Sequence, residues 1–165
     1  MKKILLIAVM AIACVAFVNA QPRAIGGRLG AFDGVSYQHG FGESNMLEIE
    51  AGWGISGGIN GYWGWGHTVQ AAVTYDWIDP CGAKFPAMPK GEWHWYLGVG
   101  GAGGYGFYDW GFLGAAGRCG VEYDFWFPLQ LSIDYRPVLG AAFAQGGAGF
   151  YWDVWGLCLG VRYKF

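Results

Sequence analysis

Residues 120–137 read GVEYDFWFPLQLSIDYRP, which is two alternating runs on either side of a proline-containing turn. Before the turn, apolar Val121 is followed by Glu122; after it, apolar Leu131 is followed by Ser132, and the alternation continues in both runs. Successive side chains of a strand point to opposite faces, so strict alternation indicates strands with one apolar and one polar face. The stretch therefore predicts an antiparallel hairpin, and we place its centre near Trp126.

The same period of two runs through the rest of the chain. The alternating stretches are residues 24–32, 34–40, 47–53, 69–77, 93–100, 113–123, 129–136 and 157–165. The first two are joined around Asp33-Gly34, a strong hairpin signal between alternating runs. The pattern predicts an all-β fold of eight antiparallel strands in up-and-down order.

Composition excludes several other classes of protein. Of the 165 residues, 54% are hydrophobic and 13% charged, and the chain holds 31 glycines and only 6 prolines. Low hydrophobicity is the signature of disorder, and collagen needs a glycine period that is absent here. The longest uncharged aromatic stretch is interrupted by glycines that a transmembrane helix tolerates poorly. A β-structure with an apolar outer surface remains.

The first 20 residues are typical of a secretory signal peptide. Lys2 and Lys3 precede an apolar run over residues 4–18, and a cleavage site is expected between Ala20 and Gln21. A membrane anchor and a lipoprotein site are weaker alternatives. Residues 1–20 are therefore predicted as signal and 21–165 as a single domain. Without its two N-terminal lysines the chain is more acidic than its net charge of −2, which argues against a nucleic-acid partner.

The charged residues separate a transmembrane barrel from a soluble sandwich. Many of them lie on the face opposite the apolar one, and this face is too polar to be half of a sandwich core. The predicted lumen charge network is Arg28, Glu48, Glu50, Arg118, Glu122, Asp134, Arg136 and Arg162. Because an eight-stranded barrel is just wide enough for side chains, charges inside it must be paired. A centre near Trp126 would set Arg118 opposite Asp134 and Glu122 opposite Gln130. We expect a lumen filled by side chains, with a narrow or gated polar path as the alternative.

Aromatic residues gather at strand ends. If the C-terminus is periplasmic and the strands alternate in direction, one set falls on a single membrane face as an aromatic girdle. This predicted periplasmic girdle is Tyr75, Trp77, Trp93, Trp95, Tyr123, Tyr163 and Phe165. Residues 55–66, 105–111 and 139–149 become outer loops, and the opposite rim is expected to hold Trp63, Trp65, Tyr105, Trp110, Tyr151 and Trp152.

The chain resembles the small outer-membrane β-barrel proteins of the OmpX/OmpA type. The resemblance rests on the signal peptide, AIGGRLG at 24–30, LEIEAGW at 47–53, the hairpin at 120–137 and the closing LGVRYKF at 159–165. It implies location in the outer membrane, contact with its lipid, and recognition of the terminal Phe165 by the barrel-insertion machinery. The resemblance supplies no catalytic residues.

Other candidate chemistry is weak. His39, His67 and His94 lack the spacing of metal ligands, and no Ser/His pair forms a local catalytic motif. The glycine pattern at 98–103 is followed by a further strand rather than by the helix that dinucleotide binding needs. We therefore expect no metal, cofactor or catalytic site, and a monomer. The expected function is a non-enzymatic structural or surface-interacting role; the alternative is a small channel or carrier for hydrophobic or small polar solutes.

Overall fold

The structure is a computed structural model, and it describes residues 23–42, 44–56, 66–86, 88–106, 109–144 and 146–165. The predicted signal peptide with its cleavage site at Ala20 and Gln21 lies outside the described residues, as do Trp63 and Trp65. Within these ranges no helix is long and apolar enough to cross a bilayer.

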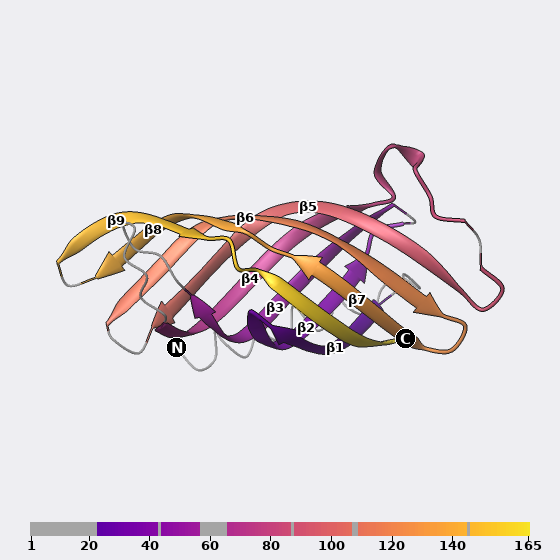
Figure 1. Cartoon of the computed structure of the whole chain (residues 1–165), viewed down its shortest axis with the longest axis horizontal. Helices are drawn as coiled ribbons and strands as arrows, with labels where there is room; N and C mark the ends of the chain where they lie inside the picture. The colour runs from indigo at the N-terminus through magenta and orange to yellow at the C-terminus, as the bar shows by residue number, and fades with distance from the viewer. Residues whose placement is uncertain (1–22, 43, 57–65, 87, 107–108, 145) are drawn as a thin grey trace, which may run out of the picture.

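The described chain is built of antiparallel strands (Figure 1). They are β1 Arg23–Gly30, β2 Phe32–Gly40, β3 Asn45–Ser56, β4 Gly66–Ile78, β5 Gly91–Gly106, β6 Trp110–Phe125, β7 Leu129–Tyr135, β8 Val138–Ala144, β9 Gly147–Asp153 and β10 Leu157–Lys164, with one short 3-10 turn, η1, at Pro80–Gly82.

The sheet closes on itself as an eight-stranded barrel. Each of the strands β1 to β5 pairs with the next, β5 pairs with β6, β6 with β7, β7 with β10, and β10 returns to β1. The predicted eight-stranded antiparallel barrel is thus confirmed. We call the end where β1 starts and β10 finishes the termini end, and the opposite end the loop end.

The strands β8 and β9 extend the barrel beyond its rim at the loop end. Against β6, the strands β7 and β8 keep one register, in which Cys119 pairs with Tyr135 and Ala116 with Val138. β9 in turn runs on into β10 after a short break. Because β1 has ended by Gly30, β9 is left as the last strand of the sheet order. Figure 1 shows this hairpin projecting at one end of the molecule.

One of the predicted outer loops is wrong, because residues 139–149 lie mostly in β8 and β9. The predicted loop at 105–111 contains the connection between β5, which ends at Gly106, and β6, which begins at Trp110. The stretch at 139–149 is rich in glycine, which favoured a loop. Here small residues are needed because two strands approach closely: a Cβ on Gly140 would collide with the backbone of Leu113.

The first hairpin turns earlier than predicted. Arg28 pairs with Gly34 and β2 already begins at Phe32, so the turn lies at Ala31 rather than at Asp33-Gly34. Asp33 still supports the turn from within β2, because its Oδ1 accepts a hydrogen bond of 2.9 Å from the Gly30 backbone N–H.

The hairpin between β6 and β7 is also shifted. Glu122 pairs with Ser132 and Gly120 with Asp134, so the turn is centred on Phe127 and the predicted partners of Arg118 and Glu122 are wrong by two residues. A shift of two residues keeps every side chain on its face, whereas a shift of one would turn the strand inside out. The assignment of faces therefore survives the error in register.

Apolar side chains cover the outside of every barrel strand. One example from each, in sheet order from β1 to β7 and then β10, is Leu29, Val35, Trp53, Val69, Val99, Leu113, Ile133 and Val161, all at least 49% exposed. Most of the charged residues of the same strands are buried inside, and those near the strand ends are partly or fully exposed. The polarity of this barrel is inverted relative to a water-soluble protein.

A glycine of β5 shows how tightly the inside is filled. A Cβ on Gly98 would fall on Asp76 Oδ1 and within 2.9 Å of the Tyr75 carbonyl oxygen, whereas on outward-facing Gly101 the nearest atom would be 3.8 Å away. We expect Gly98→Ala to lower the free energy of unfolding by about 1–3 kcal/mol, measured by urea unfolding in detergent micelles. Gly101→Ala, the control, should be neutral or stabilising by about 0.4–1 kcal/mol. Equal effects of the two variants would contradict a filled lumen.

Candidate functional site: the charged lumen

A belt of paired charges crosses the inside of the barrel. It consists of four arginines and four carboxylates, all 6% exposed or less: Arg28, Arg118, Arg136, Arg162, Glu48, Glu50, Asp76 and Asp134. We call this set the charge belt. Its members come from β1, β3, β4, β6, β7, β10 and the link between β7 and β8. Every second residue of a barrel strand points inward, which is how strands far apart in the sequence bring these groups together.

Glu48 is the hub of the charge belt. Its Oε1 lies 3.3 Å from Arg28 Nη1 and 2.6 Å from Arg162 Nη2, and its Oε2 pairs with Arg118 Nη1. Gln38 Nε2 donates a further hydrogen bond of 2.9 Å to the same carboxylate. One β3 side chain therefore joins arginines of three other strands.

A second group surrounds Arg118. Its Nη1 lies 2.8 Å from Asp76 Oδ2 and its Nη2 lies 3.4 Å from Asp134 Oδ2, while Asp134 also pairs with Arg28. Arg118 Nη2 donates a 3.0 Å hydrogen bond to Tyr96 OH, and the guanidinium carbon lies 4.6 Å from the centre of that ring. The contact between Arg118 and Asp134 forms even though the two residues are not directly opposite in the hairpin.

The remaining belt residues complete the pairing toward the loop end and along β10. Arg136 Nη1 lies 3.0 Å from Glu50 Oε2, and Glu50 also pairs with Arg28. Arg162 donates hydrogen bonds of 2.8 Å to Ser36 Oγ and 2.7 Å to Ser132 Oγ. Four cations and four anions cancel, and each member of the belt has at least one oppositely charged partner, which buried charges require.

Of the eight predicted network residues, seven lie in the charge belt. The eighth, Glu122, forms no ion pair among the described residues and lines a cavity at the termini end. Asp76 belongs to the belt and Tyr96 contacts it through Arg118, although neither was in the predicted network. Alternation already placed Asp76 on the polar face of the stretch at 69–77. Tyr96 was obscured by its neighbours Trp93 and Trp95 on the same strand.

An apolar cluster fills the lumen toward the loop end. We call it the apolar plug; it comprises Ala72, Ala102, Phe112, Ala116, Val138, Ala142 and Tyr151, with Trp110 packed against it. The rings of Phe112 and Tyr151 stack with centroids 4.3 Å apart. Tyr151 was expected at the outer rim but is fully buried, because β9 continues the alternation and turns this ring inward.

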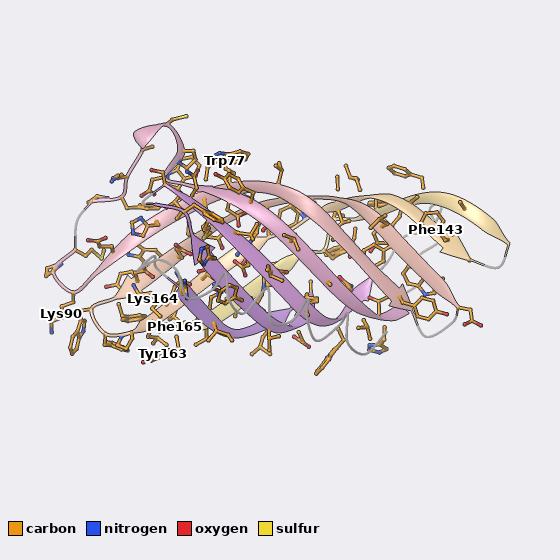
Figure 2. The ribbon with its side chains drawn as sticks, turned by 180° about the vertical axis from the view of Figure 1, so that it is seen from behind. Trp77, Lys90, Phe143, Tyr163, Lys164 and Phe165 are labelled. Carbon is orange, nitrogen blue, oxygen red and sulfur yellow. The ribbon has the colours of Figure 1, made fainter. Side chains whose placement is uncertain are left out.

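The predicted girdle residues lie at the termini end. Tyr75 and Trp77 are near the end of β4, and their rings pack edge to face with centroids 5.5 Å apart. Trp93 at the start of β5 lies 4.9 Å from the ring of Tyr123. The other members are Trp95, Tyr163 and Phe165. Figure 2 shows Trp77, Tyr163 and Phe165 at the same end, with Phe143 at the other.

The long connection between β4 and β5 folds back on this end of the barrel. Asp79 Oδ1 accepts a hydrogen bond of 3.2 Å from the Trp95 backbone N–H, and its Oδ2 lies 2.8 Å from His94 Nδ1. Trp95 Nε1 donates to the Ala83 carbonyl at 2.5 Å. The connection is thus tied to the start of β5 rather than being a simple turn.

The charge belt and the apolar plug together fill the lumen with side chains. In the part of the chain that the structure describes, no three His, Cys, Asp or Glu side chains are grouped so as to hold a metal ion. Cys81, Cys119 and Cys158 are free; Cys119 is exposed on the outer wall and Cys158 is buried in the lumen. Among the described residues, the site therefore provides paired charges and packing.

The chain was compared with family models, curated proteins and solved structures, and none of the three comparisons finds a match.

Proposed function

We propose that this protein is a non-enzymatic outer-membrane β-barrel whose lumen is closed by its own side chains, with a structural or surface-interaction role. The observation that carries the proposal is the inversion of polarity: large apolar side chains are exposed on every barrel strand while paired charges fill the inside. A soluble protein rarely exposes contiguous apolar surface of this extent. In a bilayer the same surface contacts hydrocarbon, and barrel closure satisfies the backbone hydrogen bonds.

The proposed orientation places the termini end in the periplasm. The connection between β6 and β7 at that end has only three residues, and aromatic residues surround it, as in outer-membrane barrels. A cleavable signal peptide over residues 1–20, the resemblance to OmpX/OmpA-type barrels and recognition of Phe165 by the insertion machinery belong to the same proposal. The barrel closes within one chain, which supports a monomer.

The loop end supports a role in surface interaction. There the hairpin of β8 and β9 projects beyond β1 and exposes Leu139, Phe143 and Phe150, each more than half exposed. The alternative of a small channel or carrier is opposed by two obstacles in the lumen, the charge belt and the apolar plug.

Cys119 allows a direct test of membrane insertion, because it lies on the outer wall between the two barrel ends. In lipid vesicles, we expect a charged, membrane-impermeant maleimide to leave Cys119 unlabelled, since the bilayer covers it; in urea it should react fully. The extent of labelling at Cys119 is the difference in attached maleimide between the wild-type chain and Cys119→Ser, measured by mass spectrometry. Cys81, which is exposed in the connection after β4, is the control expected to react in detergent micelles.

Rapid labelling of Cys119 in a chain that is folded and bound to vesicles would contradict a transmembrane barrel. Recovery of the folded chain in buffer without detergent, with no heat-dependent shift on a gel, would do the same.

A further inference from the structure

The lumen is open at the termini end, where it forms a cavity of about 220 Å³ that we call the vestibule. All eight barrel strands contribute to its lining, and Lys164 near the chain end marks its position in Figure 2. The lining combines charged groups with apolar side chains such as Met46 and Ile78. The charge belt does not fill the vestibule, and the proposed function gives this cavity no role.

The burial of Glu122 in the lining of the vestibule is not explained by the contacts of its carboxylate. The residue is 3% exposed, and its Oε2 has no hydrogen-bond partner among the described residues. A buried carboxylate without a partner is costly, so its position calls for a counter-group. The charge belt does not supply one, because its four guanidiniums already face four other carboxylates.

Three basic residues line the vestibule, and none of them forms an ion pair with Glu122 in the described part of the chain; Arg23 has an interaction partner of its own, and the other two are engaged elsewhere. Lys164 Nζ lies 3.0 Å from Asp124 Oδ2, and His94, which is opposite Glu122 in the sheet, has its Nδ1 2.8 Å from Asp79. Among the described residues, Asp124 Oδ1 also has no hydrogen-bond partner. The wall of the vestibule thus contains two buried carboxylate oxygens whose hydrogen-bonding capacity is unused.

We propose that the vestibule binds a small organic cation of the primary alkylammonium class. Its ammonium group would donate to the carboxylate of Glu122, and its short alkyl chain would lie against Met46 and Ile78. A charge-assisted hydrogen bond to a desolvated carboxylate is among the strongest available. The cavity equals the liquid volume of roughly seven waters, which is enough for a four-carbon amine. The described residues offer no grouping for a metal ion.

Butylammonium chloride is the probe for this site. The full chain, folded in detergent micelles at pH 8 and constant ionic strength, should bind it saturably in a calorimetric titration, while 1-butanol should not bind. Glu122→Gln, which keeps the side-chain volume, should weaken binding by about tenfold or more, since one charge-assisted bond is lost. Glu92→Gln at the same end is the matched control, because that carboxylate is 77% exposed, and it should bind like the wild type.

The heat-dependent gel shift reports whether each variant is folded. If Glu122→Gln does not fold, Ile78→Trp provides an independent test: it fills the vestibule from its apolar side, leaves Glu122 in place, and should abolish binding. The proposal is overturned by the absence of saturable binding to the wild type, by equal binding of 1-butanol, or by unchanged affinity in a folded Glu122→Gln or Ile78→Trp variant. The site is defined by the inside of the barrel, so these outcomes are independent of the Cys119 test of membrane insertion.

Discussion

Glu48→Gln is expected to lower the free energy of unfolding by about 3–5 kcal/mol. Glutamine keeps the volume of glutamate, so the loss comes from charge and not from packing. Arg28 and Arg118 would keep other carboxylate partners, but Arg162 forms its one ion pair in the described part of the chain with Glu48. Serine hydroxyls and a glutamine oxygen would then be its only neighbours with hydrogen bonds. A buried guanidinium without a counter-charge is the source of the loss.

A double variant tests this reason. Because the cost is an uncompensated Arg162, Glu48→Gln combined with Arg162→Met should recover most of the lost stability, since removing both charges of a buried pair is far less costly than removing one. Urea unfolding in detergent micelles gives all of the free energies. Glu92→Gln, whose carboxylate is 77% exposed, serves as the charge-matched control and should change stability by no more than about 0.5 kcal/mol. If Glu48→Gln were as stable as this control, the charge of Glu48 would contribute nothing to the free energy of unfolding.

The barrel itself was predictable from the sequence because strand alternation is a local property. The stretch at 129–136 shows which side chains point inward without any knowledge of its neighbours. The two-residue error at the turn did not matter for the faces, since both registers keep Asp134 inside. The same reasoning would have placed Tyr151 inside, had residues 147–153 been recognised as a strand despite their glycines.

The partners within the lumen could not be predicted in this way. Glu48 meets Arg162 and Arg118 because closure brings β3 opposite β10 and β6, and these distances depend on barrel tilt and on the register of every pair between them. Alternation identified Glu122 as an inward-facing carboxylate. The structure was needed to show that the four guanidiniums pair with four other carboxylates and that Glu122 lies outside the charge belt.

Two sets of side chains obstruct the lumen, and the second large effect that we expect concerns ion conduction through it. The charge belt fills the middle of the barrel with side chains, and the apolar plug toward the loop end opposes water and ions as a hydrophobic constriction does. In planar bilayers the wild-type chain should show no single-channel steps. Arg118→Ala with Asp76→Ala should also show none, because the plug remains. This pair of changes keeps the belt neutral, and Glu48 and Asp134 keep Arg28 as a partner.

Phe112→Ala with Tyr151→Ala removes the stacked rings of the plug but leaves the belt, so it should be equally silent. Only the chain that carries all four changes should give resolved steps, because only there are both obstacles removed. The matched control replaces the belt changes by Lys164→Ala and Asp124→Ala, an ion pair of 3.0 Å outside the belt, in the same plug-deficient background, and it should not conduct. The gel shift confirms that each variant is folded. Steps in the plug variant alone would show that the belt is permeable, and steps in the wild type would replace the closed barrel by a channel.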